Sequence, residues 1–553
     1  MSWLLLLAVG TAAQPQQAKP AATASTGYRI AGVVVNSLTG APIAGASVGI
    51  APTAGASDRI SKTYTTAADG RFSFPGVSRG KYSLMATARG FSLQYFEHHD
   101  EFSTAIAVGP DLEAEHLIFR MDPDAAVEGQ VIDENNEPVQ NAMIRLFERR
   151  IQDGREKTVP STQTQTDDVG RYRISHLSPG NFYLAVSARP WYAQNFQFNA
   201  GRGANDTEAE QRMRQDEAAR NVTYPLTFYP DSPDSAGAGI IALNAGERTT
   251  ADVVLRAVPA LTLRIRLPLA ADQGQGFQAR APRLSQRIFE GYLDPASNAL
   301  FSSSQPGLTE VSGVAPGHYV VEMSGIYGPS GKGRSWYHEI DLTGDAELNA
   351  TETSAFASVS GTVFFENAAT VPRDSFLLIS NPATGESFRS PISDKGQFDF
   401  TADSVKPGRY NVLLENAHGF FLKKISATGA RMAGRTLEIT GASSVNLKCT
   451  ASRGIAQVIG TALRDGQPFA GAMIVLAPQD LANNVALVRR DQSDSDGTFT
   501  LPNVVPGRYT VLAIANGWDL EWGNPAALQP YLEGGEPIEI TGDGKAEVKV
   551  QVH

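Results

Sequence analysis

The sequence predicts an all-β protein, a tandem array of about five small β-sandwich modules, and three observations support this. The chain has 553 residues, several times the length of one domain. It contains 52 Gly, 32 Pro, 25 Phe and 16 Tyr, and many turns combined with many aromatic residues favour β structure. The third observation is a repeated pair of turns, Asp-Gly followed by Pro-Gly-x-Tyr.

The pair of turns recurs five times along the chain. The last copy has Asp496-Gly497, then the alternating segment Phe499 to Leu501, then Pro506-Gly507-Arg508-Tyr509. Three other copies read Asp69-Gly70 with Gly80-Lys81-Tyr82, Asp168-Val169-Gly170 with Pro179-Gly180-Asn181-Phe182, and Asp394-Lys395-Gly396 with Pro407-Gly408-Arg409-Tyr410. The third copy in the chain keeps only Pro316-Gly317-His318-Tyr319.

Each part of this pattern has a structural role. Gly accepts a positive φ and Asp caps the turn, so Asp-Gly predicts a tight turn. The alternation of apolar and polar residues that follows predicts a half-buried strand. The Gly residues of the second turn lie 100, 137, 91 and 99 residues apart. This spacing is too long for the short solenoid repeats and predicts an array of domains.

A second signature precedes three of the pairs: a strand, a polar turn, a Pro-apolar bend and an Ala that enters a strand. It is found in residues 32–48, 129–144 and 460–474. Together the two signatures resemble the carboxypeptidase regulatory-like family of bacterial repeat proteins, with a Greek-key, prealbumin-like (carbohydrate-binding-like) sandwich fold. The resemblance covers most of the chain after about residue 27 and is weakest in the third copy. It implies the fold but no particular ligand.

The tails of the repeats predict the domain boundaries. The expected modules are 27–122, 123–257 with an insertion at 192–240, 258–355 as a divergent copy, 356–452 and 453–553. The insertion contains a charged segment, 205–221, that is compatible with a short helix or with disorder. Because the linkers are very short, we expect a semi-rigid rod or an arched chain.

The N-terminus predicts export. Residues 3–13 form a short apolar stretch ending in small residues, and 14–26 are polar, so we expect a signal peptide and linker over 1–26. We therefore expect a secreted, periplasmic or cell-surface protein. The net charge of −11 and the absence of a basic run argue against nucleic-acid partners, and no apolar run predicts a membrane span. The single cysteine, Cys449, excludes a disulfide within the chain.

Catalytic and cofactor motifs are not found, so we expect a protein that is not an enzyme and that has no cofactor and no metal. His98 and His99 are adjacent, and adjacent residues of a strand face opposite ways, so we interpret this segment as a polar loop. Residues 491–497 superficially resemble a calcium loop but lack the spaced Glu, and Asp496-Gly497 already fills the turn position.

Aromatic residues are the candidate ligand-binding residues. They follow the Pro-Gly-x-Tyr strand in three modules and comprise Trp191, Tyr192, Trp336, Tyr337, Trp518, Trp522 and Tyr531. Aromatic faces suit sugar rings. Amphipathic Trp and Tyr also cover sandwich ends or pack between modules, and their recurrence fits both interpretations.

Three functions remain open from the sequence. The first is a non-catalytic binding or scaffold array whose partner is a polysaccharide or a cell-envelope protein. The second is a structural surface protein or adhesin. The third is an accessory partner of an outer-membrane transport or peptidase system. Specificity is expected in what varies between copies, namely the aromatic segments and the 192–240 insertion.

Overall fold

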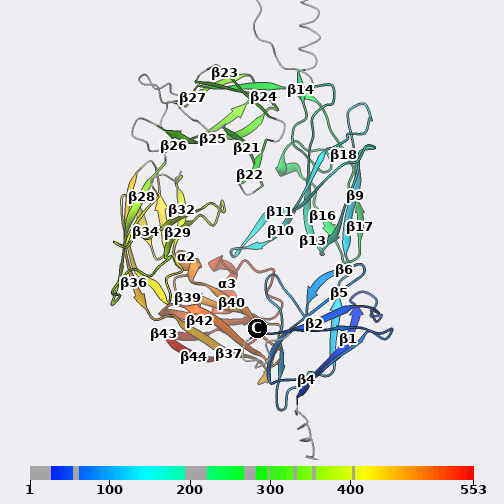
Figure 1. Ribbon diagram of the computed structural model, residues 1–553, viewed down its shortest axis with the longest axis vertical. Helices are drawn as coiled ribbons and strands as arrows, with labels where there is room; N and C mark the ends of the chain where they lie inside the picture. Colours follow the sequence, from blue (N-terminus) through cyan, green and yellow to red (C-terminus); the bar gives the residue numbers. More distant parts are fainter. Residues whose placement is uncertain are drawn as a thin grey trace, which may run out of the picture.

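The computed structural model describes residues 27–53, 61–193, 221–266, 282–289, 291–296, 299–305, 307–327, 333–350, 356–400, 405–441 and 443–553. The expected signal peptide and most of the charged segment 205–221 lie outside these residues. The described chain is all-β and forms five successive pairs of sheets, each pair enclosing a hydrophobic core (Figure 1). The predicted array of β-sandwich modules is confirmed.

The strands of the first module are β1 (Tyr28–Asn36), β2 (Ser47–Pro52), β3 (Lys62–Thr65), β4 (Arg71–Val77), β5 (Gly80–Ala88), β6 (Phe91–Tyr95), β7 (Ile106–Val108) and β8 (Leu117–Met121). One sheet has the order β4-β1-β8. The facing sheet has the order β3-β2-β5-β6, with β7 also paired to β5.

The strands of the second module are β9 (Ala125–Ile132), β10 (Met143–Gln152), β11 (Arg155–Gln165), β12 (Arg171–Leu177), β13 (Gly180–Ser187), β14 (Val222–Thr223), β15 (Thr227–Phe228), β16 (Ile241–Leu243), β17 (Arg248–Thr250) and β18 (Val253–Val254). The short helix η1 spans Ser235–Gly237. β15 and β16 lie beside β13 in its sheet, and β14 pairs with β19 (Val258–Pro259).

The strands of the third module are β20 (Leu261–Arg266), β21 (Arg283–Ile288), β22 (Tyr292–Pro295), β23 (Leu300–Gln305), β24 (Leu308–Val314), β25 (Gly317–Tyr327), β26 (Gly333–Leu342) and β27 (Ala346–Asn349). The strands of the fourth module are β28 (Ser358–Phe365), β29 (Phe376–Ser380), β30 (Ser387–Pro391), β31 (Gln397–Asp399), β32 (Gly408–Glu415), β33 (Phe420–Thr428), β34 (Arg431–Ala433), β35 (Thr436–Ile439) and β36 (Ser444–Arg453).

The elements of the fifth module are β37 (Ala456–Arg464), β38 (Gln467–Pro468), β39 (Met473–Pro478), α2 (Leu481–Asn484), η2 (Val485–Leu487), β40 (Arg489–Gln492), β41 (Thr498–Val504), β42 (Gly507–Ile514), α3 (Pro525–Leu532), β43 (Glu536–Ile540) and β44 (Gly544–Gln551). α2 and η2 lie between β39 and β40, and α3 lies between β42 and β43.

All five modules share one arrangement around the opening strand. The opening strand pairs antiparallel with the strand after the first turn, as β1–β4, β9–β12, β20–β24, β28–β31 and β37–β41. It pairs parallel with the strands that end the module, as β1–β8, β9 with β17 and β18, β20–β27, β28–β36 and β37–β44. The third module therefore keeps this pairing although its sequence has lost the first turn.

The Asp-Gly turn contacts the opening strand directly. Gly70, Gly170, Gly396 and Gly497 all have φ close to +70°. The carbonyl of each accepts a hydrogen bond from the opening strand of its module, as from Val34 N to Gly70 O (2.9 Å). In the second module Asp167, and not the predicted Asp168, caps the turn, because its Oδ1 accepts the backbone N–H groups of Val169 and Arg171.

The tyrosine of Pro-Gly-x-Tyr ties its strand back to the turn before it. In four modules its hydroxyl donates to the carbonyl four residues upstream, in the pairs Tyr82–Ser78, Tyr319–Ala315, Tyr410–Lys406 and Tyr509–Val505, at 2.8–3.0 Å. The second module has Phe182 here, which has no hydroxyl. The repeated tyrosine therefore satisfies a backbone carbonyl at the entrance to the strand.

We predict that Tyr509→Phe lowers the free energy of unfolding by about 1–3 kcal/mol, because the Val505 carbonyl then loses its partner inside the protein. Urea unfolding followed by tryptophan fluorescence measures this, since Trp518 and Trp522 lie in the same module. Tyr95→Phe, at an exposed tyrosine, is the control and should change little. Equal stability of Tyr509→Phe and wild type would contradict the prediction.

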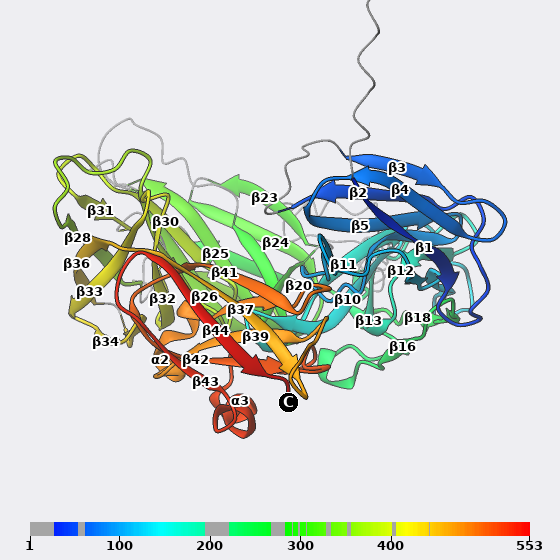
Figure 2. The same ribbon diagram turned by 90° about the horizontal axis from the view of Figure 1, so that it is seen from below.

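The chain is not a rod, and the expected arch closes completely. The modules follow one another around a ring, and the first and fifth modules meet (Figures 1 and 2). Backbone groups hydrogen-bond across this junction, from Ser495 N to Ala105 O at 3.0 Å. Closure depends on contacts between residues about 390 positions apart in the chain, such as the hydrogen bond from Ala105 N to Asp494 Oδ1, and short linkers alone do not predict it.

Candidate functional site

The first turn of the fifth module inserts against the first module. Asp494 Oδ1 accepts the N–H of Ala105 (3.0 Å), and Ser495 Oγ accepts the N–H of Ala107 (2.8 Å). Lys81 forms an ion pair with Asp494 and donates to Thr498 Oγ1 at 2.5 Å. Burial raises the pKa of Asp494, while Lys81 opposes that shift. The segment that superficially resembles a calcium loop therefore lies in an interface between modules.

Gln492 lies beside this turn and joins the same two modules. Its Nε2 donates to the Glu97 carbonyl and to Thr104 Oγ1, and its Oε1 lies 3.2 Å from His99 Nδ1. The neighbouring Asp491 is buried, and burial raises its pKa to about 6. The polar loop predicted around His98 and His99 is thus the part of the first module that receives the fifth.

Aromatic rings form the apolar half of this junction. The His99 ring stacks on Trp518 with 4.7 Å between centroids and 4° between planes. Phe102 lies 5.9 Å from the same indole. Trp518 is only 8% exposed, because it also packs on the core of its own module. Its ring faces already contact protein.

Arg490 of the fifth module adds charged contacts to the same loop of the first module. Its guanidinium lies 5.0 Å from the Phe102 ring centroid and 4.7 Å from that of Trp522. Its Nη2 donates to Glu101 at 3.0 Å, and its Nη1 lies 3.6 Å from Asp100. Burial raises the pKa of Asp100, and Arg490 opposes this.

The β10–β11 hairpin of the second module reaches the same place. Gly523 N donates to Gly154 O (2.8 Å), and Glu156 N donates to Glu521 Oε1 (3.0 Å). A Cβ on Gly154 would lie 2.5 Å from Gly523 N and 2.9 Å from the Trp522 ring, and its φ is +79°. Glycine at the tip of the hairpin therefore permits this close approach.

A cavity of about 610 Å³ lies where these three modules meet. The first module contributes the loop Asp100–Phe102, the second the hairpin residues Arg150–Asp153, and the fifth Val488–Arg490 and Trp522. The volume is in the range of small-molecule sites, which often lie at domain interfaces. This is the candidate functional site that sequence reasoning missed, because its walls are far apart in the chain.

Trp191 and Tyr192 lie together in the second module, after β13. Trp191 is 69% exposed, and its ring is perpendicular to that of Tyr192, with 5.7 Å between centroids. Tyr192 donates its hydroxyl to Glu134 Oε1 at 2.9 Å. Burial and this hydrogen bond raise the pKa of Tyr192 to about 12. The pair presents an open indole beside a carboxylate.

The other predicted aromatics have partners within the protein. Trp336 is buried in the core of the third module, beside His338. Tyr337 contacts Phe356, with Lys406 5.3 Å from its ring centroid. Tyr531, on α3, packs with Trp518 and Trp522 against one hydrophobic cluster. The structure thus brings together only the three aromatics of the fifth module, and separately Trp191 with Tyr192; ligand binding by all seven stays a prediction.

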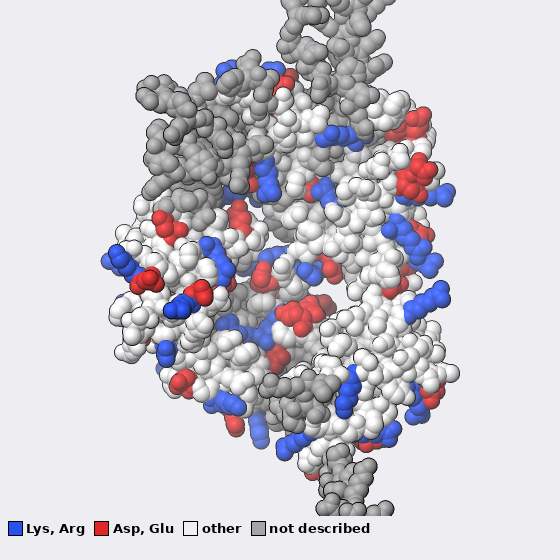
Figure 3. All heavy atoms as spheres, in the orientation of Figure 1, with Lys and Arg blue, Asp and Glu red and all other residues white. Residues whose placement is uncertain are grey.

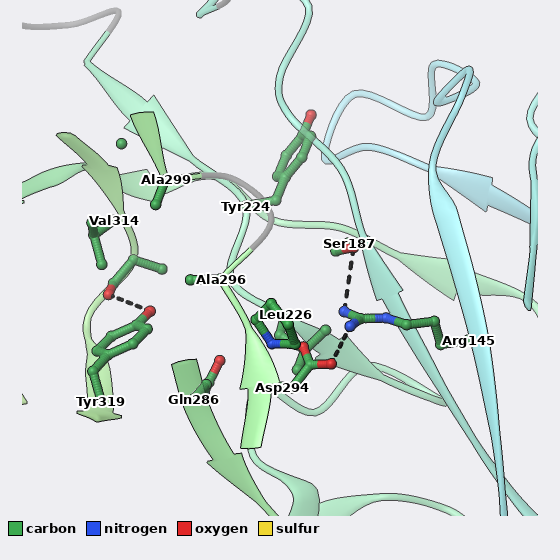
Figure 4. A pocket seen from close by; sticks show the side chains of 13 residues that line it. Arg145, Ser187, Tyr224, Leu226, Gln286, Asp294, Ala296, Ala299, Val314 and Tyr319 are labelled. Carbon is green, nitrogen blue, oxygen red and sulfur yellow. Dashed lines mark hydrogen bonds and ion pairs between the residues drawn. The ribbon is translucent and has the colours of Figure 1, made fainter. Parts of the chain in front are cut away.

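A smaller pocket lies between the second and third modules. Arg145 forms an ion pair with Asp294 there, and Tyr224 and Tyr319 lie on its walls (Figure 4). Burial raises the pKa of Asp294, and Arg145 opposes this. The pocket measures about 30 Å³, far below the roughly 300–1,000 Å³ of small-molecule sites.

Charge and metal-ligand geometry describe the rest of the surface. Basic and acidic side chains are interspersed over the face drawn in Figure 3. Within the described ranges, no group of three or more His, Cys, Asp or Glu side chains could hold a metal ion. No helix in the described part of the chain is long and apolar enough to cross a membrane.

Comparison with known families bears on the first two modules. Residues 29–108 and 126–211 match the family model of the carboxypeptidase regulatory-like domain. The resemblance read from the turns is confirmed for these two segments. No curated protein matches the chain.

Several solved structures are similar at low identity. The minor pilin GBS52 of Streptococcus agalactiae is 12% identical, with a TM-score of 0.21, over 44% of this chain and 100% of the pilin. The Bacillus anthracis TIE protein is 12% identical, with a TM-score of 0.14, over 92% of this chain and 68% of that protein. BcpA, the major pilin subunit of Bacillus cereus, is 9% identical, with a TM-score of 0.13, over 77% and 99%. Such low scores carry no argument about function.

Proposed function

We propose that this protein is a non-catalytic, secreted or periplasmic scaffold that binds a polysaccharide through Trp191. The observation that carries the proposal is the 69% exposure of Trp191, since the other three described tryptophans are buried or partly buried. An indole face offers a sugar ring an apolar surface for stacking. Glu134, which already accepts the Tyr192 hydroxyl, supplies a carboxylate for sugar hydroxyls.

The closed ring supports the scaffold part of the proposal. Ion pairs and hydrogen bonds join the first and fifth modules, and a backbone hydrogen bond joins the fourth and fifth, from Arg435 N to Asn483 O at 2.9 Å. A closed array holds its modules at fixed mutual positions, which suits a structural surface protein. Such a protein would contact other proteins of the cell envelope, so a cell-envelope protein is the second candidate partner.

Binding of soluble polysaccharides tests the proposal, with tryptophan fluorescence and calorimetry as readouts. We expect wild type to bind at least one polysaccharide, and Trp191→Ala to weaken that binding about tenfold, which corresponds to ~1.4 kcal/mol. Phe364→Ala is the matched control, because Phe364 is also an exposed aromatic, 66% accessible, in another module. It should bind like wild type.

Two results would contradict the proposal. Unchanged affinity of Trp191→Ala would remove the role of Trp191. A wild-type protein that binds no polysaccharide, while a cell-envelope extract retains it, would favour the protein partner instead.

A further inference from the structure

The cavity between the first, second and fifth modules has walls of balanced charge. Three arginines and three carboxylates line it, namely Arg150, Arg489 and Arg490 with Asp100, Glu101 and Asp153. Most of these already have a partner of opposite charge or a carbonyl. Arg489 donates to the carbonyls of Ala486, Val488 and Asn503, and Asp153 pairs with Lys157 at 3.0 Å. A charged ligand would have to compete with these pairs, whereas a neutral one would not.

Exposed hydrogen-bonding groups remain on the cavity walls. The side chains of Arg150, Glu101 and Asp153, which line the cavity, are 51%, 65% and 61% exposed. The Arg150 guanidinium is a donor, and the two carboxylates are acceptors. A hydroxyl group both accepts and donates, so it can join a guanidinium to a carboxylate without disturbing the charge balance.

Aromatic surface completes the site. Phe102 and Trp522 line the cavity from different modules, with the Arg490 guanidinium near both rings. Rings of this kind pack against the C–H groups of a sugar or cyclic polyol. Gln152, from the hairpin of the second module, adds an amide that both donates and accepts.

We propose that this cavity binds a small uncharged polyhydroxy molecule, of the size of a mono- or disaccharide, and that the bound molecule stabilises the closed ring. The cavity volume of about 610 Å³ suits such a ligand. Ligand binding and ring closure are coupled because three modules supply the cavity walls. The complete site therefore exists only when the ring is closed. A ligand that binds only the closed form shifts the equilibrium towards it.

This site shares no residue with the Trp191 surface, so it does not depend on the proposed function. Trp191 lies on the second module beside Glu134, whereas the cavity uses the tip of the β10–β11 hairpin of that module. The two sites can therefore be tested separately in one protein.

Calorimetry and thermal unfolding of the full chain test the inference, using neutral mono- and disaccharides and cyclic polyols, with glucuronate and glucosamine as charged counterparts. We expect a neutral compound to bind and to raise the unfolding temperature, and the charged counterparts to bind at least tenfold more weakly. Arg150→Ala should weaken binding about tenfold, because Arg150 lines the cavity and is half exposed.

Arg173→Ala is the matched control in the same module. Arg173 is 49% exposed against 51% for Arg150, and its ion pair with Glu128 measures 3.6 Å against 3.9 Å for Arg150 with Glu148. It lies outside the cavity walls and should bind like wild type. Gln152→Ala provides a second cavity variant that removes no charge.

Three results would overturn the inference. The first is no binding of any neutral compound at millimolar concentration. The second is unchanged binding in both Arg150→Ala and Gln152→Ala. The third is loss of small-sugar binding in Trp191→Ala, which would place the ligand at Trp191. If Trp191→Ala loses only polysaccharide binding, the cavity and the proposed function are both supported.

Discussion

Gly361→Ala should lower the free energy of unfolding of the fourth module by about 3 kcal/mol. Gly361 lies on β28, and a Cβ there would be 2.0 Å from Leu447 O and 2.6 Å from Phe398 Cζ. One of these contacts is with the backbone of β36, the parallel partner of β28, so the two strands would have to separate. The expected loss is therefore larger than that of a usual surface substitution.

The same glycine recurs because it faces an aromatic ring. Four opening strands place a glycine opposite an aromatic residue, in the pairs Gly32–Phe72, Gly129–Tyr172, Gly361–Phe398 and Gly460–Phe499. In the third module Ile265 faces Thr309 instead. In this module the larger side chain is on the opening strand and the smaller one is on its partner, so the space in the core is filled in either arrangement.

Urea unfolding by circular dichroism and hydrogen exchange of the β28, β31 and β36 peptides measure the effect. Gly441→Ala is the control in the same module, because a Cβ on Gly441 would meet nothing within 4 Å. It should leave stability unchanged or raise it slightly by restricting the unfolded chain. If both variants unfold at the same urea concentration as wild type, the steric argument is wrong.

Trp518→Ala should open the ring and cost about 3–5 kcal/mol in stability. The indole packs in the cluster of the fifth module with Leu528 and Met473, and on its other side it contacts His99 and Phe102 of the first module. Its removal leaves a cavity in one module and takes away the apolar part of the junction. The polar contacts that remain, such as those of Gln492, compete with water once the junction is loosened.

Small-angle scattering and thermal unfolding provide the two readouts. The radius of gyration should rise, and exchange of amide hydrogens around Ala105 and Ala107 should become faster. Trp191→Ala is the matched control, because it removes the same side chain from an exposed position. A Trp518→Ala protein with an unchanged radius and an unchanged melting temperature would show that the junction does not depend on the indole.

Local patterns were readable from the sequence because their partners are close in the chain. The Asp-Gly turn, the alternating strand and the Pro-Gly turn each depend on a few consecutive residues, and they predicted both the number and the type of modules. One recurring element of the same kind was missed. Thr66, Thr166 and Ser493, four residues before the glycine of the turn, each accept the N–H of an alanine and donate to the carbonyl of the Pro-apolar bend.

That missed element had a signal in the sequence. A Thr or Ser stands at the same distance from the turn in the three modules that carry the Pro-apolar bend, whereas the fourth module has Ile392 there. The hydrogen bond from this hydroxyl therefore occurs in the modules that have the Pro-apolar bend. Reading both signatures together would have predicted it.

The candidate site was less predictable than the fold. Trp518 and Trp522 were singled out from the sequence, whereas Gln492 and Asp494 appeared only within the segment 491–497 and Arg490 was not singled out. Their partners Glu101, Thr104 and Ala105 lie nearly 390 residues earlier. Nothing local to either segment encodes that pairing.

The sequence by itself determined the sandwich modules, because strand alternation, turn chemistry and the tyrosine that bonds back to the turn in four modules act over short distances. Only the tertiary structure decided that the array closes into a ring and that three modules enclose a cavity. The physical reason is that closure depends on complementary surfaces that meet only after each module has folded. No common sequence pattern marks the residues that meet at the junction. Examples are the pairs Lys81–Asp494, His99–Trp518 and Gly154–Gly523.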